Sequence, residues 1–580
     1  MTARRVTLAW PDADRLCAAR RAALLGPGAP FEMTTTEVLG RSESVFVKRA
    51  ANLREVFLSG TERFAQQPYI TFPDAEYTYG ALRPAVASIA AALRDRHGVG
   101  KGDRVAIVAA NCPEFAVVFW AAVTLGAIAV ALNGWWTGPE ISYGVNLTEP
   151  KVIFGDARRL ARVSGVDFGV PVVEFESAFA GYLEYDPAAA ISTTPIAEDD
   201  PYVILFTSGT TGRPKGALLS HRNNIAFVQS AMLGAAARNA ILAEQAAANG
   251  SPPLEQPNGV TASCTLNASP MFHISGLNAQ VVMSMFTGGQ IAYAAPGKWR
   301  EDVFLEMTAK YRPAAWSLVP TQLWRLLEWP GLEGYDLSSV RSVGGGSAVW
   351  APELLRALER KLPWMRPGLA TGFGMTETSG AGTSLKPPDT YEHPESIGVA
   401  SPGVEVEVRD PDTHAALGEG EVGEVCLRGA MVFLGYWNNA PATEKALGDD
   451  RWYRTGDFGY IADGFVYLQG RRSDLIIRAG ENISPIEIEN CILEHADVLE
   501  VAVIGVEHPV LGQEVKAIVV IREVGAIDAD DVRRWVSESL SAFKVPAHVE
   551  FVTSMPHNAS GKVMKHLLAT PGATSDFIEE

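Results

Sequence analysis

A loop rich in glycine and hydroxyl groups follows a strongly apolar run near residue 204. The segment ILFTSGTTGRPKG, residues 204–216, contains three threonines, a serine, three glycines and Lys215. Backbone N–H groups and hydroxyls of such a loop can surround phosphate oxygens, because glycine lets the backbone approach closely. Its spacing differs from the Walker P-loop, in which two glycines four residues apart precede Lys and Ser or Thr. The loop therefore predicts a phosphate site of another kind, with a plain surface turn as the alternative.

Four more segments with conspicuous polar groups follow along the chain. They are TGFGMTETSG (371–380), WYRTGDFGY (452–460), GRRSDLIIRAGENISPIEIE (470–489) and NASGKVMK (558–565). Taken singly, a glutamate in a turn, an Asp–Arg pair or a lysine near the end of a chain is usually a solvated surface group. The order of all five segments favours a shared site instead.

With these five motifs in this order, the chain resembles the adenylate-forming superfamily, which includes acyl- and aryl-CoA synthetases, adenylation domains of peptide synthetases and firefly-type luciferases. The resemblance covers about residues 50–570 and is strongest to acyl-CoA synthetases, or fatty-acid–CoA ligases, of the bacterial type. It implies that a carboxylate attacks the α-phosphate of ATP, that pyrophosphate leaves, and that a thiol then displaces AMP. ATP, Mg²⁺ and CoA are the implied cofactors.

The resemblance also assigns roles to single residues. Lys562 would contact the carboxylate and the α-phosphate, Thr376 would contact the α-phosphate, and Glu377 would hold Mg²⁺ with Thr207. His273, in PMFHISGL, would occupy the gate position of fatty- and aryl-acid ligases, with a core histidine as the alternative. The nucleotide- and CoA-binding positions would be Thr207, Ser208, Gly209, Thr210, Thr211, Gly212, Lys215, Gly345, Gly346, Ser347, Thr371, Gly372, Phe373, Gly374, Asp457, Arg471 and Gly480.

Some of these positions have a more specific implied role. Asp457 would accept hydrogen bonds from the ribose hydroxyls, and Arg471 would add a ribose or phosphate contact. Phe373 stands where the family often has a tyrosine stacked on adenine, so stacking survives but a phenolic hydrogen bond does not. Gly480 would let pantetheine pass close to the backbone. Ser473 falls at the implied hinge, where relatives often carry Lys or Asp.

Two features narrow the range of carboxylic acids that are expected as substrates. His273 stands where amino-acid-activating relatives place an Asp for the substrate ammonium, which argues against α-amino acids. The glycines at 344–346 leave volume for a bulky acyl group, or they serve backbone geometry alone. Further pocket candidates are Phe272, Asn278, Trp316, Val319, Gly344, Gly345 and Gly372. We expect a medium- or long-chain fatty acid or a bulky aryl or steroid-type acid.

Two other functions are compatible with the motifs. An acyl-AMP ligase that loads a carrier protein would form the adenylate but would not use free CoA. A nonenzymatic binding protein of the same fold would be expected to lose Lys562, Glu377 or Asp457, and all three are present.

Composition excludes several classes of protein. The chain has 580 residues and a formal net charge of −18, so nonspecific nucleic-acid binding is not expected. Its five cysteines have no CxxC or zinc-like spacing. No uninterrupted apolar run approaches the roughly 20 residues that span a bilayer, and neither end shows a targeting signal. The expected location is the cytoplasm, the expected partners are the small-molecule acid, ATP and CoA, and a homodimer is left open.

Alternating strand-like and helix-like segments predict an α/β fold. We expect an extension at 1–50, a large N-terminal domain at 51–472 with layered α/β sheets and a small β-barrel-like part, and a small α+β domain at 473–580 carrying Lys562. The resemblance implies that this last domain is mobile. The alanine-rich stretch at 235–260 is read as a helix extension followed by a surface loop.

Overall fold

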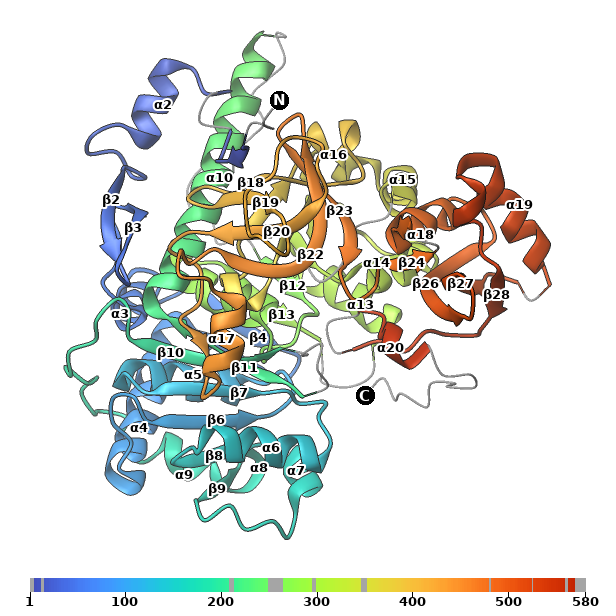
Figure 1. The fold of residues 1–580 in the computed structure, drawn as a ribbon. Helices are drawn as coiled ribbons and strands as arrows, with labels where there is room; N and C mark the ends of the chain where they lie inside the picture. Colours follow the sequence, from blue (N-terminus) through green and yellow to red (C-terminus); the bar gives the residue numbers. More distant parts are fainter. Residues whose placement is uncertain are drawn as a thin grey trace.

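The computed structural model describes residues 5–11, 15–207, 213–248, 264–294, 299–345, 352–478, 481–523, 525–558 and 562–568. These residues form a large α/β body with a smaller C-terminal unit at one side (Figure 1). Two extended sheets run through the body, and helices cover them. This is the α/β fold with a small C-terminal domain that the sequence predicts.

One sheet of the body has seven described strands and is mostly parallel. In spatial order they are β21 (Gly435–Tyr436), β11 (Lys215–Ser220), β10 (Pro201–Thr207), β7 (Ile128–Leu132), β6 (Arg104–Val108), β8 (Val152–Gly155) and β9 (Val172–Glu174). Helix α5 (Pro113–Leu125) connects β6 to β7, and its residues from Phe115 onward are all buried. Gly126 ends this helix at φ 77°, a left-handed conformation that glycine adopts without strain. The apolar segment at residues 113–132 thus forms a buried helix followed by a buried strand.

The second sheet has fourteen described strands and changes character along its length. In spatial order they are β1 (Thr7–Leu8), β19 (Glu405–Arg409), β20 (Gly423–Arg428), β22 (Tyr453–Ala462), β23 (Phe465–Arg471), β18 (Ser396–Ala400), β17 (Gly382–Leu385), β16 (Leu369–Gly374), β15 (Ser342–Gly344), β14 (Ala315–Ser317), β12 (Cys264–Asn267), β13 (Gln290–Tyr293), β4 (Pro68–Phe72) and β5 (Ala75–Thr78). The strands from β4 to β16 pair in parallel, and those from β16 to β19 are antiparallel. The antiparallel half includes β19, β20, β22 and β23, which lie beyond residue 401 in the chain.

Helices pack on both sheets of the body. The longer ones are α3 (Leu53–Arg63), α4 (Tyr79–His97), α5, α6 (Gly138–Thr148), α10 (His221–Ala248), α13 (Glu301–Tyr311), α14 (Pro320–Leu327) and α15 (Pro352–Lys361). The shorter ones are α7 (Ala157–Leu160), α8 (Phe175–Ala178), α9 (Ala180–Leu183), α11 (Ile274–Gly276), α12 (Met283–Thr287), α16 (Asp389–Glu392) and α17 (Ala440–Ala446). The main core lies between α3, α4, α5 and the strands that they cover.

The C-terminal unit has a core of its own. Its elements are β24 (Ile476–Arg478), β25 (Glu481–Ile483), α18 (Pro485–Leu493), β26 (Val498–His508), β27 (Gly512–Ile521), α19 (Ala529–Ser539), β28 (His548–Phe551) and α20 (Lys565–Leu568). Apolar side chains such as Ile488, Val503 and Val519 are buried between α18, α19 and the sheet. The mixture of helices and strands is that of the small α+β unit that the sequence predicts. The domain boundary at residue 473 stays a prediction.

Helix α10 is unusually long, and it rises beside α2 (Ala18–Leu25) beyond the body (Figure 1). By length and composition, its segment His221–Glu244 could cross a membrane, although 44% of the most apolar window is buried inside the structure. Its first turn contains the buried polar residues His221, Asn223 and Asn224. That burial is typical of a core helix in a folded domain. The helix extension is confirmed to Ala248, and the loop expected after it lies outside the described residues.

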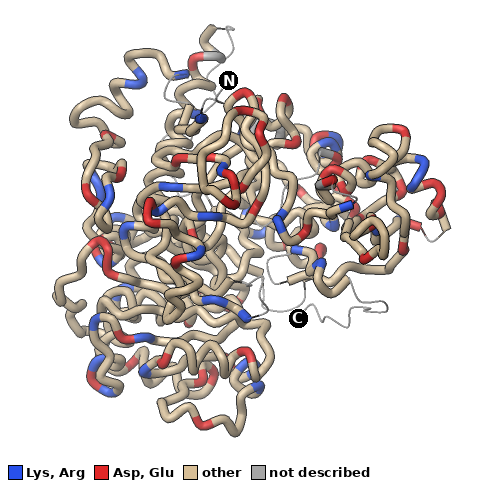
Figure 2. The backbone as a smooth tube through the Cα atoms, in the orientation of Figure 1, with Lys and Arg blue, Asp and Glu red and all other residues tan. Residues whose placement is uncertain are grey.

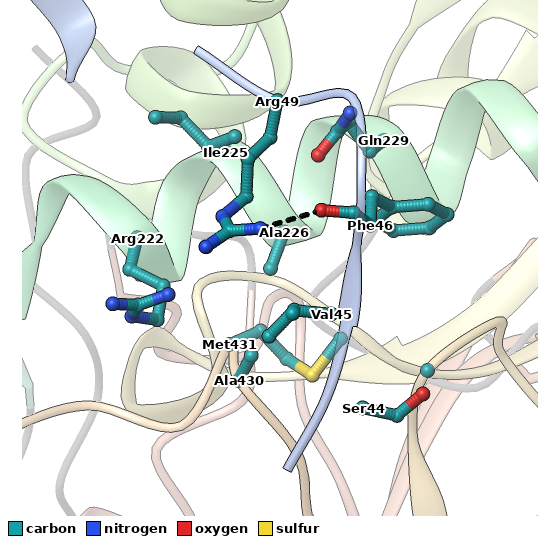
Figure 3. Close-up of a pocket in the computed structure, with 11 residues that line it drawn as sticks. Ser44, Val45, Phe46, Arg49, Arg222, Ile225, Ala226, Gln229, Ala430 and Met431 are labelled. Carbon is teal, nitrogen blue, oxygen red and sulfur yellow. Dashed lines mark hydrogen bonds between the residues drawn. The ribbon is translucent and has the colours of Figure 1, made fainter. Parts of the chain in front are cut away.

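Within the described part of the N-terminal extension, α2 and the hairpin pack along α10, whereas β1 joins β19 at the edge of the large sheet. The hairpin, β2 (Met33–Val38) and β3 (Arg41–Phe46), leaves a pocket against α10 that is lined by Val45, Ile225 and Met431 among others (Figure 3). None of the residues assigned chemistry lines this pocket. Basic and acidic residues are interspersed along the described chain (Figure 2), so the negative net charge is spread over many elements.

Candidate functional site

The phosphate-loop motif is anchored by a pair of facing strands. Thr207 ends β10 and Lys215 begins β11, and the two are direct partners in the antiparallel ladder. The Thr207 hydroxyl donates to the Lys215 carbonyl at 3.5 Å, which closes the base of the loop. Several predicted binding positions lie outside the described residues: Ser208, Gly209, Thr210, Thr211, Gly212, Gly346, Ser347 and Gly480.

Glu377 lies in a tight turn directly after β16. The turn η5 (Thr376–Thr378) is a single 3-10 turn, and the following Ser379 adopts φ 58°, which is unusual for a residue with a side chain. Glu377 is only 6% exposed and accepts a hydrogen bond from the Tyr436 hydroxyl at 2.7 Å. Burial raises the pKa of Glu377, while the Tyr436 bond and the charges of Arg471 and Lys215 oppose that rise.

The strand that leads into this turn has Thr371, Gly372, Phe373 and Gly374 in sequence, paired with β17. A Cβ at Gly372 would lie 2.5 Å from the Thr383 carbonyl oxygen, so only glycine fits there. Phe373 packs against the core of the antiparallel half of the sheet, and Gly374 is exposed. The sequence TGFG therefore combines a close backbone approach with an accessible end next to Glu377.

A second group of charges forms where β22, β23 and the C-terminal segment meet. Asp457 and Arg471 are cross-strand partners, and Arg471 Nε donates to Asp457 Oδ1 at 3.2 Å. Asp457 is 8% exposed, and burial raises its pKa against the opposing charges of Arg471 and Lys562. Burial by itself lowers the pKa of Arg471, but Asp457 and its other neighbours raise it above the usual value.

Lys562 joins this group from the far end of the chain. Its backbone N–H donates to Asn558 Oδ1 at 2.9 Å, and the residue is exposed. Although the residue is exposed, desolvation of its ammonium and the charge of Arg471 lower the pKa of Lys562, whereas Asp457 and Asp474 partly offset this. Charges from four segments of the chain therefore act on one another here: Lys215 and Arg471 act on Glu377, and Arg471 and Lys562 act on Asp457.

His273 lies in a different setting, where α11 and the π-helical turn η2 (Leu277–Val282) follow it. Its Nε2 atom is buried with no hydrogen-bond partner in the described residues, and its ring lies 4.9 Å from that of Phe272. Burial lowers the pKa of His273 to about 4, so the imidazole is neutral near pH 7. A neutral ring with an unused nitrogen can accept or donate one hydrogen bond to a bound molecule.

The glycines at the end of β15 differ from one another. A Cβ on Gly344 would meet no atom of the described residues within 4 Å, whereas one on Gly345 would collide with the Leu318 carbonyl oxygen. Gly345 therefore serves a close backbone approach, and the volume for an acyl group beside Gly344 stays a prediction.

Two other pocket candidates are buried and hydrogen-bonded within the fold. Trp316 is 1% exposed, packs on Phe304 and donates to Thr308 at 3.0 Å, so it is a core residue. Asn278 is fully buried, accepts from Tyr202 at 2.7 Å, and donates toward the Ser379 carbonyl at 3.5 Å. Its amide is thus committed to internal hydrogen bonds.

Tyr436 was missed by the sequence reasoning. It contacts Glu377 through its hydroxyl and lies under Lys215 with its ring, 5.0 Å from Nζ. The motif GYWNN that contains it has no spacing typical of catalysis, so proximity in the fold was needed to find it. Among the described residues, no cluster of three His, Cys, Asp or Glu side chains could hold a metal ion by itself.

Comparisons with known proteins agree with this arrangement. Residues 59–437 match the family model described as AMP-binding enzyme, and residues 487–562 match that of the AMP-binding enzyme C-terminal domain. The chain is 31% identical to the indoleacetate–CoA ligase of Aromatoleum aromaticum, covering 88% of this chain and 96% of that protein. It is 30% identical to 4-coumarate–CoA ligase 3 of Oryza sativa subsp. japonica, covering 84% of this chain and 86% of that protein.

A solved structure is similar over the same region. The crystal structure of ATP-bound MatB from Rhodopseudomonas palustris superposes with a TM-score of 0.77 at 29% identity, covering 89% of this chain and 98% of that one.

Proposed function

Because this chain belongs to the family of AMP-binding enzymes and is an acid–thiol ligase, we propose that it joins a bulky apolar carboxylic acid, an aromatic acid in preference to a fatty acid, to CoA through an acyl-adenylate. The observation that carries the adenylate chemistry is the ion pair of Arg471 with buried Asp457, on which the charge of Lys562 also acts. Together with Glu377 and Lys215, side chains from four segments provide both the cations and the carboxylates that adenylation requires.

Each charged residue has a part in the first half-reaction, the formation of the acyl-adenylate. A carboxylate attacking an α-phosphate brings two anions together, so fixed cations must offset the repulsion. Lys562 orients the attacking carboxylate against the α-phosphate, and Lys215 and Arg471 balance the phosphate charge. Asp457, held by Arg471 in the β22–β23 ladder, accepts from the ribose hydroxyls.

The residues also fit a magnesium ion. Mg²⁺ is usually held by one or two carboxylates together with substrate phosphates, rather than by an all-protein cage. Buried Glu377 beside Lys215 suits that arrangement, and Thr207 would assist it. When bound, Mg²⁺ would neutralise phosphate charge and make the α-phosphate more electrophilic.

The nature of the acid is inferred from the acyl side of the site. The lack of described atoms around a Cβ at Gly344 favours a bulky group, and the neutral imidazole of His273 provides no charge for a second carboxylate or an amine. Relatives named for indoleacetate and 4-coumarate support an aromatic acid. A location in the cytoplasm and a homodimeric state remain expectations from the sequence.

The first test measures AMP release from ATP and Mg²⁺, with and without CoA, over acids from acetate to long-chain, aryl and steroid carboxylates. We expect CoA-dependent turnover that is highest with arylacetic or arylpropenoic acids. Lys562→Ala should abolish it, whereas Lys565→Ala, which removes a nearby lysine paired with Glu489, should not. Adenylate formation without CoA turnover would favour a carrier-protein acceptor. A preference for long-chain acids would overturn the aromatic assignment.

A further inference from the structure

Tyr436 connects two charged residues of the candidate site that come from separate parts of the chain. Its hydroxyl donates to Glu377 Oε1 at 2.7 Å, and its ring lies 5.0 Å from the ammonium of Lys215. Neither contact follows from sequence proximity, because 59 residues separate Tyr436 from Glu377. One aromatic side chain therefore touches both an expected metal ligand and an expected phosphate cation.

The surrounding backbone holds Tyr436 in place. Its strand β21 pairs with β11, so that Tyr436 is the ladder partner of Ala217, two residues beyond Lys215. Its N–H donates to the Thr443 hydroxyl at 2.9 Å, and its ring packs edge-on against Phe433 at 4.9 Å. The Phe433 N–H in turn donates to the Glu377 carbonyl at 2.8 Å. The segment 433–436 thus fixes the glutamate turn through both main chain and side chain.

The energetics make the hydroxyl important. A buried carboxylate is costly unless hydrogen bonds stabilise its charged form, and bonds to an ionised group are stronger than neutral ones. Glu377 is buried, and the Tyr436 bond favours its ionised form. That bond occupies Oε1 and leaves Oε2 to other partners. A lysine ammonium above a tyrosine ring adds a weaker, less directional attraction.

Resting on the proposed function, we propose that Tyr436 is a positioning residue for the nucleotide site: its hydroxyl orients the Glu377 carboxylate toward the metal ion, and its ring holds the Lys215 ammonium toward the phosphates. These two actions are separable, because one uses the hydroxyl and the other uses the ring. A tyrosine that only fills space would affect neither metal nor nucleotide binding.

The test compares Tyr436→Phe, which keeps the ring, with Tyr436→Leu, which loses both groups. Calorimetry measures ATP binding in EDTA and across a Mg²⁺ titration, independently of turnover. Tyr436→Phe should bind ATP in EDTA within about twofold of wild type but need about tenfold more Mg²⁺, since a hydrogen bond to a charged group is lost. Tyr436→Leu should in addition weaken ATP binding in EDTA about threefold, through loss of the cation–π contact.

A matched control separates this role from general destabilisation. Tyr79→Phe also removes a buried hydroxyl, which lies 2.7 Å from the carbonyl oxygens of Ser284 and Gly289. Neither of these hydrogen-bond partners belongs to the candidate site. It should leave both ATP and Mg²⁺ binding unchanged. If Tyr436→Phe matches wild type or Tyr79→Phe in its Mg²⁺ dependence, the positioning role is wrong.

A double-variant cycle covers the case in which single variants are poorly stable. In a Glu377→Gln background the carboxylate is absent, so adding Tyr436→Phe should not weaken Mg²⁺ dependence further. Additive effects of the two changes would overturn the proposal. A wild-type chain that releases no AMP with any acid would count against the proposed function instead, because these binding measurements do not require turnover.

Discussion

Gly344 and Gly345 are neighbours at the end of β15, yet a side chain would meet different surroundings at each. Of the two, only Gly344 has no described atom within 4 Å of where a Cβ would lie. Gly344→Leu should therefore occupy volume that the acyl group needs and lower kcat/KM for bulky acids about tenfold or more. This is the size of effect expected when a pocket becomes too small for even one methylene of the substrate. Short acids such as acetate should be spared or favoured. The measurement is kcat/KM over a series of acids of increasing size.

Gly345→Ala is the matched change, because its Cβ would collide with the Leu318 carbonyl. It should lower the melting temperature without changing the order of preference among acids. Equal loss for short and bulky acids in Gly344→Leu would contradict the assignment of this space to the acyl group.

Lys562 gives a pH dependence whose direction can be worked out. Desolvation and Arg471 lower its pKa, so its ammonium is lost at a lower pH than that of an ordinary lysine. Adenylate formation should then decline as pH rises through that value. Asp474 opposes the shift, so Asp474→Asn should lower the pKa of Lys562 further and move the alkaline limb to lower pH.

Pyrophosphate exchange at a series of pH values measures this half-reaction, with Asp474→Glu as the charge-preserving control. Thioester formation from supplied acyl-adenylate should keep its own pH profile in the Asn variant. An alkaline limb that stays in place or moves to higher pH would show that Asp474 does not act on Lys562.

At the scale of elements, contiguous apolar runs made much of the fold predictable. Helix α5 and strand β7 follow from an apolar segment broken by Gly126, since a buried helix and a buried strand both need little polarity. The pairing of β1 with β19 could not be predicted, because Thr7 and its ladder partner Glu407 lie at widely separated positions in the sequence. Local patterns determine elements, while pairing between distant strands depends on tertiary packing.

The site divides in the same way. Glu377, Asp457 and Lys562 could be selected as candidates because each belongs to a motif that resembles one of the adenylate-forming superfamily. Tyr436 and the internal bonds of Asn278 could not, because their importance comes from partners that are distant in sequence. The roles of individual residues, including those in the loop after Thr207, stay predictions.

The junction of α3 and α10 carries a prediction about acid stability. His221, the first residue of α10, is fully buried, and its Nδ1 accepts from the Leu53 N–H at the start of α3 at 3.1 Å. Burial lowers the pKa of His221 from 6.5 to about 3. Between these values the unfolded chain binds a proton that the folded chain excludes. The free energy of unfolding should therefore fall as pH falls below 6.5, by at most about 1.4 kcal/mol per pH unit from this group.

Denaturant unfolding at pH 7.5 and 5.5 measures this effect. His221→Gln should be less stable than wild type at pH 7.5, because the bond to Leu53 is disturbed, but should lose less stability on acidification. His548→Gln, at an exposed histidine, is the matched control and should keep the wild-type pH dependence. An unchanged pH dependence in His221→Gln would mean that other groups cause the acid sensitivity.

At the scale of the whole molecule, two ion pairs join the body to the C-terminal unit. Arg522 Nη1 lies 2.6 Å from Glu328 Oε2, and Arg356 Nη2 lies 3.2 Å from Glu494 Oε1. The Arg522 guanidinium also lies over the Trp324 ring, 6.0 Å from its centroid. Both pairs exist in the orientation that brings Lys562 to Asp457. They should therefore stabilise this orientation against any other that the C-terminal unit adopts.

Reversing one charge should thus slow only the half-reaction that needs Lys562. Because a partly exposed pair contributes up to about 1 kcal/mol, Glu328→Arg should slow acyl-adenylate formation about two- to fivefold. Thioester formation from supplied acyl-adenylate should be unchanged or faster.

Arg522→Glu in the same chain should restore the pair and most of the rate. Arg534→Glu, which reverses a charge paired with Asp531 within α19, should affect neither half-reaction. Equal slowing of both half-reactions, or no rescue by the second reversal, would mean that this ion pair does not select the orientation.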